Sequence, residues 1–126
     1  MSNDASIYSK ELIEKAQERK HFGRMNDPTC SAYTMGICGD EMEFYLIITD
    51  GIIEDVRYFT EGCISTLLCG SIAAELVSGK SIYDALRVSP HCVLEQLKGL
   101  PPEGTHCSIL AVTTLHKAIA DYLLKP

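Results

Sequence analysis

Residues 43–60, EFYLIITDGIIEDVRYFT, decide the fold class of this 126-residue chain. Two runs rich in β-branched and aromatic side chains flank the pair Asp50-Gly51. Asp-Gly between such runs is a strong β-hairpin signal, because both central positions of the turn need a positive φ. A third strand is expected just before the hairpin, around residues 32–35. The stretch therefore predicts a three-stranded antiparallel sheet.

Helical periodicity flanks the predicted sheet on both sides. Residues 6–20 carry apolar side chains four residues apart, with charged ones between them. Residues 63–79 and 111–124 carry longer apolar stripes, and residues 81–100 hold two short helical pieces. A helix, three strands and then further helices predict a single α+β domain over residues 1–126, with the sheet covered by helices.

The composition excludes several classes of partner. The chain is 46% hydrophobic and 22% charged, which suits one compact domain. Its 17 acidic and 11 basic residues give a net charge of -6, so no basic face for nucleic acid is expected. The start, MSNDASIYSK, does not read as a secretory signal, and no apolar run is judged long enough to cross a membrane. The sequence therefore predicts a cytoplasmic protein without nucleic-acid or membrane partners.

Six cysteines need an explanation in such a chain. A reducing compartment disfavours disulfides, so metal binding or thiol chemistry is the better interpretation. Cys38 lies in a glycine-flanked turn, Cys63 at the junction of the third strand and the long helix, and Cys107 at the start of the last helix. Turns and helix starts can meet at one edge of a sheet. With Asp40 and His106, these cysteines predict a site of three sulfur ligands and two candidates for a fourth position.

Cys107 is the cysteine expected to be most reactive. Gly104 is interpreted as a stop and Thr105 as an N-cap, which places His106 and Cys107 in the first turn of the last helix. Unpaired N–H groups and the positive helix end favour a thiolate at this position.

The remaining cysteines are interpreted differently. Cys69 and Cys92 lie in helix-periodic runs and are expected to be core thiols. Cys30 lies in an expected loop and receives no role.

Five short fragments recur in a characteristic order: CGD, GC after YFTE, LVSGKS, LPP and HCSILA. This ordered set resembles the NifU N-terminal, or IscU-type, iron–sulfur cluster assembly scaffolds, from about residue 8 to the C-terminus. The resemblance implies an α+β fold with a three-stranded sheet and a cluster built at one end. Carried over by motif, the family's ligands match Cys38, Cys63 and Cys107, and its Asp and His match Asp40 and His106.

The same resemblance implies a function. A labile [2Fe–2S] cluster is assembled from iron and from sulfur delivered by a cysteine desulfurase, and is then transferred to apo iron–sulfur recipient proteins. Asp40 or His106 completes the ligand set. Cys107 is the first choice of persulfide acceptor, because the helix start and His106 both favour its thiolate. The chain is then a carrier and not an enzyme, zinc can occupy the cluster-free form, and a homodimer is left open.

One motif departs from the family pattern. Many bacterial members carry Leu-Pro-Pro-Val-Lys, which a dedicated Hsp70-type chaperone binds. Here the segment reads LPPEG, with Glu103 and Gly104 in place of the apolar and basic pair. Weak chaperone binding is therefore expected.

Three alternatives remain beside the scaffold. A structural zinc module uses the same ligand types, although its cysteines are usually paired closely in sequence. A sulfur-acceptor protein of the same fold needs only one exposed cysteine. A cysteine hydrolase using Cys107 and His106 is disfavoured, because adjacent residues on a helix point about 100° apart.

Overall fold

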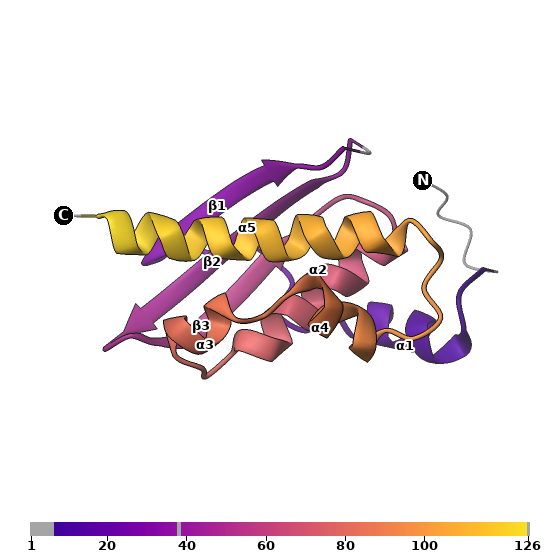
Figure 1. Ribbon diagram of the computed structural model, residues 1–126, viewed down its shortest axis with the longest axis horizontal. Helices are drawn as coiled ribbons and strands as arrows, with labels where there is room; N and C mark the ends of the chain where they lie inside the picture. The colour runs from indigo at the N-terminus through magenta and orange to yellow at the C-terminus, as the bar shows by residue number, and fades with distance from the viewer. Residues whose placement is uncertain (1–6, 38, 126) are drawn as a thin grey trace.

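A computed structural model of the protein describes residues 7–37 and 39–125 (Figure 1). The sheet has the strand order β1-β2-β3 and both pairings are antiparallel, which confirms the predicted α+β class. The predicted ligand Cys38 lies outside the described residues. The elements are α1 (Lys10–Glu18), β1 (Cys30–Met35), β2 (Glu41–Thr49), β3 (Ile52–Phe59), α2 (Ile64–Val77), α3 (Ile82–Leu86), α4 (Pro90–Gln96) and α5 (Gly104–Leu124).

The β2–β3 hairpin turns where the sequence predicts. Asp50 has φ 51° and Gly51 has φ 76°, the pair of positive values that a tight hairpin turn needs. Along β2, buried and less buried side chains alternate, as expected for a strand with one face on the core. The inward side chains of β2 are Met42, Phe44, Leu46 and Ile48.

Two helices form the layer that covers the inner face of the sheet. α5 packs against β1, β2 and α2, and Figure 1 shows it crossing the strands along the long axis of the molecule. α2 is buried on nearly all sides and lies so close to β3 that a Cβ on Gly70 would stand 2.5 Å from Cδ2 of Tyr58. The layer therefore fixes where α2 and α5 begin relative to the loops of the sheet.

The length of α5 corrects one expectation from the sequence. By length and composition alone, this 21-residue helix is apolar enough to cross a membrane, and an 18-residue window within it has a mean hydropathy of 1.2. Half of that window is buried inside the fold, against the sheet and α2. Burial of this kind is typical of the core helix of a globular domain, so packing accounts for the apolar composition.

Two cysteines lie elsewhere than the sequence predicts. Cys30 is not in a loop: it is the first residue of β1 and only 1% exposed, because its side chain points to the core. Cys92 is not a core thiol: it lies half-buried in the first turn of α4, where its Sγ is 3.4 Å from Oγ of Ser89. The short α4 turns this position outward, although its neighbour Val93 is buried.

Candidate metal centre

Three of the predicted ligands meet at one end of the helical layer. Asp40 comes from the β1–β2 loop, Cys63 directly precedes α2, and Cys107 lies in the first turn of α5. One carboxylate oxygen and the two sulfurs all lie within 4.8 Å of one another. Cys63 is 4% exposed and Cys107 is 3% exposed, so the sulfurs are largely shielded from water.

Backbone hydrogen bonds hold the loop that carries Asp40. The N–H of Gly36 donates to the carbonyl of Asp40 at 2.7 Å, and the N–H of Gly39 donates to the carbonyl of Gly36 at 3.0 Å. Gly39 has φ 85°, a conformation that side chains other than glycine rarely adopt. The tight turn therefore aims Asp40 back toward the start of α2.

A threonine hydroxyl fixes the loop before Cys63. Thr60 donates from Oγ1 to the carbonyl of Glu41 at 2.6 Å, and the same oxygen accepts the N–H of Gly62 at 3.0 Å. Cys63 follows as the N-cap residue of α2, and its carbonyl accepts the N–H of Leu67 at 3.0 Å. These bonds tie the start of α2 to the start of β2, next to Asp40.

Thr66 lies at the middle of the site, and the sequence analysis did not single it out. Its hydroxyl donates to Oδ2 of Asp40 at 2.6 Å. The same oxygen lies 3.3 Å from Sγ of Cys107 and 3.6 Å from Sγ of Cys63. The signal that could have found it is the spacing Cys-x-x-Thr at the start of a helix, which puts both side chains on one face.

The electrostatics favour the thiolate at Cys63. A hydrogen bond from Cys107 is the largest of the causes that together lower the pKa of Cys63 to about 6, and the first N–H groups of α2 act in the same direction. The pKa of Cys107 is raised, because its thiol donates to Cys63 and because it is buried.

The expectation of a low pKa at Cys107 was therefore wrong for the metal-free protein. The predicted N-cap was also wrong, since α5 begins at Gly104 and Glu103 precedes it at the cap. The N–H of Cys107 already donates to the carbonyl of Glu103 at 3.3 Å. The physical effect expected at the start of α5 acts at the start of α2 instead, on Cys63.

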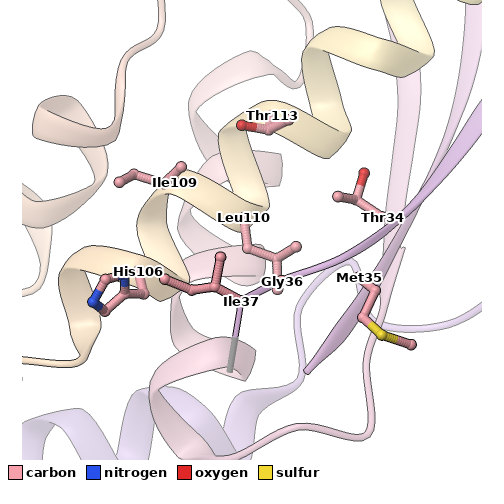
Figure 2. Close-up of a pocket in the computed structure, with 8 residues that line it drawn as sticks. All are labelled: Thr34, Met35, Gly36, Ile37, His106, Ile109, Leu110 and Thr113. Atoms are coloured by element: carbon pink, nitrogen blue, oxygen red, sulfur yellow. The ribbon is translucent and has the colours of Figure 1, made fainter. Parts of the chain in front are cut away.

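His106 is not a member of the group that the described residues form. It is exposed and lies at the end of a pocket of about 220 Å³ between β1 and α5 (Figure 2). Met35, Ile37 and Ile109, which also line this pocket, are exposed apolar side chains. His106 therefore faces a different environment from Cys107, although the two are adjacent in the chain.

Two other thiols, Cys69 and Cys30, are buried but are not members of this group. Cys69 is fully buried, as expected of a core thiol, and burial raises its pKa to about 12. Burial likewise raises the pKa of Cys30 to about 11. Both side chains therefore stay protonated at neutral pH.

The donor set suits a thiophilic metal. Two sulfurs and one carboxylate oxygen are ligand types that both iron and zinc accept. A tetrahedral metal takes four ligands, so these three donors leave one coordination position for a further ligand.

The sequence matches a known protein family. The family model described as NifU-like N terminal domain matches residues 7–126. The chain is 36% identical over 121 residues to the iron–sulfur cluster assembly scaffold protein IscU 1 of Archaeoglobus fulgidus, covering 94% of this chain and 78% of that protein. It is 37% identical over 123 residues to the scaffold protein IscU of Escherichia coli K12, covering 94% of this chain and 95% of that protein.

Solved structures share the fold at low sequence identity. A NifU-like N-terminal protein from Brucella abortus superposes with a TM-score of 0.78 at 19% identity, over 99% of this chain and all of that one. A putative scaffold protein for the SUF system from Fervidobacterium islandicum AW-1 gives 0.75 at 19% identity, over 92% of this chain and 98% of that one. These likenesses confirm the fold.

Proposed function

The chain belongs to the NifU-like N-terminal domain family and is an iron–sulfur cluster assembly scaffold, and we propose that its cargo is a labile [2Fe–2S] cluster. The observation that carries the proposal is the meeting of Asp40, Cys63 and Cys107 within 4.8 Å. Iron–sulfur clusters are usually held by four thiolates. A site that replaces one thiolate with a carboxylate holds its cluster less firmly, which suits a protein that must release it.

The remaining ligand positions are assigned by motif. We propose Cys38 as the third sulfur ligand, because it lies two residues before Asp40 in the sequence CGD. His106 is the alternative to Asp40 as the fourth ligand. The exposed position of His106 beside the pocket favours Asp40 while the cluster is bound, and leaves His106 accessible to a partner.

Sulfur is proposed to arrive from a cysteine desulfurase, with Cys107 as the acceptor. Cys107 passes the proton of its thiol to Cys63 and attacks, as a thiolate, the outer sulfur of the donor's persulfide, so that Cys107 gains that sulfur and the donor cysteine leaves as a thiolate. Cys63 is the rival acceptor, because its lower pKa supplies more thiolate. Support for Cys107 comes from its neighbour His106, which opens onto a pocket rimmed by exposed apolar side chains where a protein partner could dock.

The cluster is then passed to apo iron–sulfur recipient proteins. In this role the chain carries its cargo without chemical turnover of its own, and we expect it to act in the cytoplasm. A zinc ion held by the same donors in the cluster-free form is compatible with the ligand set.

Anaerobic purification followed by metal and sulfide analysis tests the function. The scaffold requires iron with acid-labile sulfide. It also requires a visible spectrum that changes to that of the holo-ferredoxin when an apo-ferredoxin is added. Zinc that chelators remove only when the protein unfolds would instead establish a structural zinc module. Mass spectrometry of each single cysteine variant after incubation with desulfurase and cysteine identifies the residue that gains a sulfur atom.

A further inference from the structure

We infer that Thr66 is the positioning residue of the metal centre: its hydroxyl holds the Asp40 carboxylate beside the two cysteine sulfurs and so sets the metal affinity of the site. The inference rests on the proposed function, because it takes Asp40, Cys63 and Cys107 as ligands. It concerns a residue that does not itself need to touch the metal.

The surroundings of Thr66 place its hydroxyl between all three ligands. Thr66 is fully buried in the first turn of α2, one helical turn after Cys63. Its oxygen lies 2.6 Å from Oδ2 of Asp40, 3.3 Å from Sγ of Cys107 and 3.6 Å from Sγ of Cys63.

The single hydroxyl proton determines what Thr66 can do. A hydroxyl donates one hydrogen bond and accepts up to two. The proton goes to the carboxylate of Asp40, at a distance typical of a strong charge-assisted bond. The lone pairs of the oxygen then face the sulfurs of Cys63 and Cys107. Serine can make the same contacts, whereas valine has the shape of threonine and can make none of them.

Packing fixes the direction of this hydroxyl. A Cβ on Gly62 would lie 3.0 Å from Cβ and 3.1 Å from Cγ2 of Thr66, so the methyl side of Thr66 is pressed against the backbone of the preceding loop. With the methyl group held there, the hydroxyl points toward Asp40. A group locked in this way by its neighbours can position a ligand more precisely than a mobile one.

Comparison with a second buried threonine separates this arrangement from ordinary helix packing. Thr114 in α5 is equally buried, and its hydroxyl donates to the carbonyl of Leu110 four residues earlier, at 2.7 Å. That bond is the usual local solution for a threonine inside a helix. Thr66 donates instead to a carboxylate from a distant loop, which a purely local role does not require.

The consequence is that Asp40 is oriented before metal arrives. Without the hydroxyl, the carboxylate loses its partner inside the site and can turn to solvent. Removal of a hydrogen bond of this kind to a ligand typically lowers metal affinity by about 10- to 100-fold. We therefore expect Thr66→Val to weaken divalent-metal binding to this extent and Thr66→Ser to restore most of it.

Cobalt(II) titration of the metal-free, reduced protein under anaerobic conditions provides the test. Thiolate-to-cobalt charge-transfer absorption reports binding, and the titration gives a Kd for the wild type, Thr66→Val, Thr66→Ala and Thr66→Ser. Thr114→Val is the matched control, since it makes the same change at an equally buried threonine outside the site. Circular dichroism and thermal unfolding establish that each variant is folded. If Thr66→Val does not fold, Thr66→Ala takes its place in the comparison.

A double-mutant cycle with Asp40→Ala distinguishes positioning from a structural effect. If Thr66 acts through Asp40, Thr66→Val weakens cobalt binding in the wild type and changes it little in the Asp40→Ala background. An unchanged Kd for Thr66→Val, or a full additional loss in the Asp40→Ala background, overturns the inference while the metal centre stands. A wild-type protein that forms no cobalt–thiolate band overturns the metal centre together with the role of Thr66.

Discussion

The carboxyl carbon of Asp40 lies 3.0 Å from the position that a Cβ on Gly62 would occupy. The β1–β2 loop and the loop before α2 thus approach so closely that the second one has no room for a side chain. Gly62 does not have a positive φ, so alanine would be acceptable to its backbone and the obstacle is contact alone.

Gly62→Ala should therefore weaken metal binding without unfolding the protein. The new methyl group must displace Asp40 or Thr66 by a few tenths of an ångström, which disturbs the ligand that Thr66 holds. We expect a loss of about tenfold in cobalt(II) affinity, measured by the charge-transfer titration. An affinity equal to that of the wild type would show that the close approach has no bearing on the site.

Replacement of the proposed ligand cysteines should remove the cluster. Cys63→Ser and Cys107→Ser, and Cys38→Ser by the motif assignment, should each abolish or strongly reduce anaerobic cluster assembly, since a serine hydroxyl is a poor replacement for an iron-bound thiolate. Visible absorption and iron-to-sulfide analysis measure the yield.

Cys69→Ala is the matched control for these variants. Cys69 is buried as deeply as Cys63 but lies in the core, and its high pKa keeps it protonated at neutral pH. We expect it to cost about 1 kcal/mol of stability and to leave the cluster yield unchanged. Loss of the cluster in Cys69→Ala together with retention in Cys63→Ser would mean that the ligands have been misassigned.

The pKa of Cys63 should rise when Cys107 is removed. The hydrogen bond from Cys107 is the largest cause of the lowered pKa of Cys63, so Cys107→Ala should move that pKa from about 6 toward its ordinary value of 9. Thiolate absorption near 240 nm, followed over pH in the metal-free protein, measures the shift. Among the described cysteines, Cys92 also has a lowered pKa, because its thiol is hydrogen-bonded to Ser89. The titration is therefore made in a Cys92→Ser background.

The lowered pKa of Cys63 also makes the stability of the folded protein depend on pH. With a pKa lowered to about 6, Cys63 is ionised in the folded chain between pH 6 and 9 and protonated in the unfolded chain. Its contribution therefore grows as the pH rises through this window, is complete above 9, and is lost as the pH falls through 6. Thermal unfolding of Cys107→Ala should lack that gain, and an identical pH profile in both proteins would argue against a thiolate at Cys63.

Asp40→Ala should slow cluster release. A carboxylate is a harder and more exchangeable iron ligand than a thiolate, so its removal closes the route by which a recipient's thiol can enter. The rate of transfer to an apo-ferredoxin, followed by circular dichroism in the visible range, should fall several-fold relative to the wild type. Transfer at the same or a higher rate would exclude a labile-ligand role for Asp40.

The altered double-proline segment should be a poor chaperone ligand. A peptide of residues 97–105 should stimulate ATP hydrolysis by the bacterial Hsp70-type chaperone far less than the same peptide with Glu103→Val and Gly104→Lys, because the acidic side chain reverses the charge presented to the partner. Equal stimulation would show that the double proline suffices. A peptide is required because a Cβ on Gly104 in the folded protein would meet Leu100 at 2.9 Å.

Local signals in the sequence account for most of the fold. Asp50-Gly51 determines the hairpin through its positive φ values, and residue periodicity identifies the helices. The prediction for Cys30 was wrong because the strand begins earlier than its apolar run indicates, and strand ends depend on pairing with a neighbouring strand.

The sequence identified three residues that meet at the site, but it did not predict the contacts among them. Turn and helix-start positions identified Asp40, Cys63 and Cys107, which the structure brings together. The bond from Thr66 to Asp40 and the proton shared by the two sulfurs depend on how the β1–β2 loop, α2 and α5 pack, which no local pattern specifies. The position of His106 could not be predicted either. Its neighbour in sequence, Cys107, faces the site, whereas His106 does not.

The three proposed ligands that meet at this centre come from a loop of the sheet and from the starts of two different helices. A metal or cluster bound to Asp40, Cys63 and Cys107 therefore acts as a cross-link between distant parts of the chain, closing long loops that are open in the unfolded protein. Cargo that binds only the folded chain raises its stability by mass action. Delivery of the cluster thus leaves behind a looser domain, more readily cut by a protease than the loaded one, and limited proteolysis can report how much of the scaffold is carrying cargo.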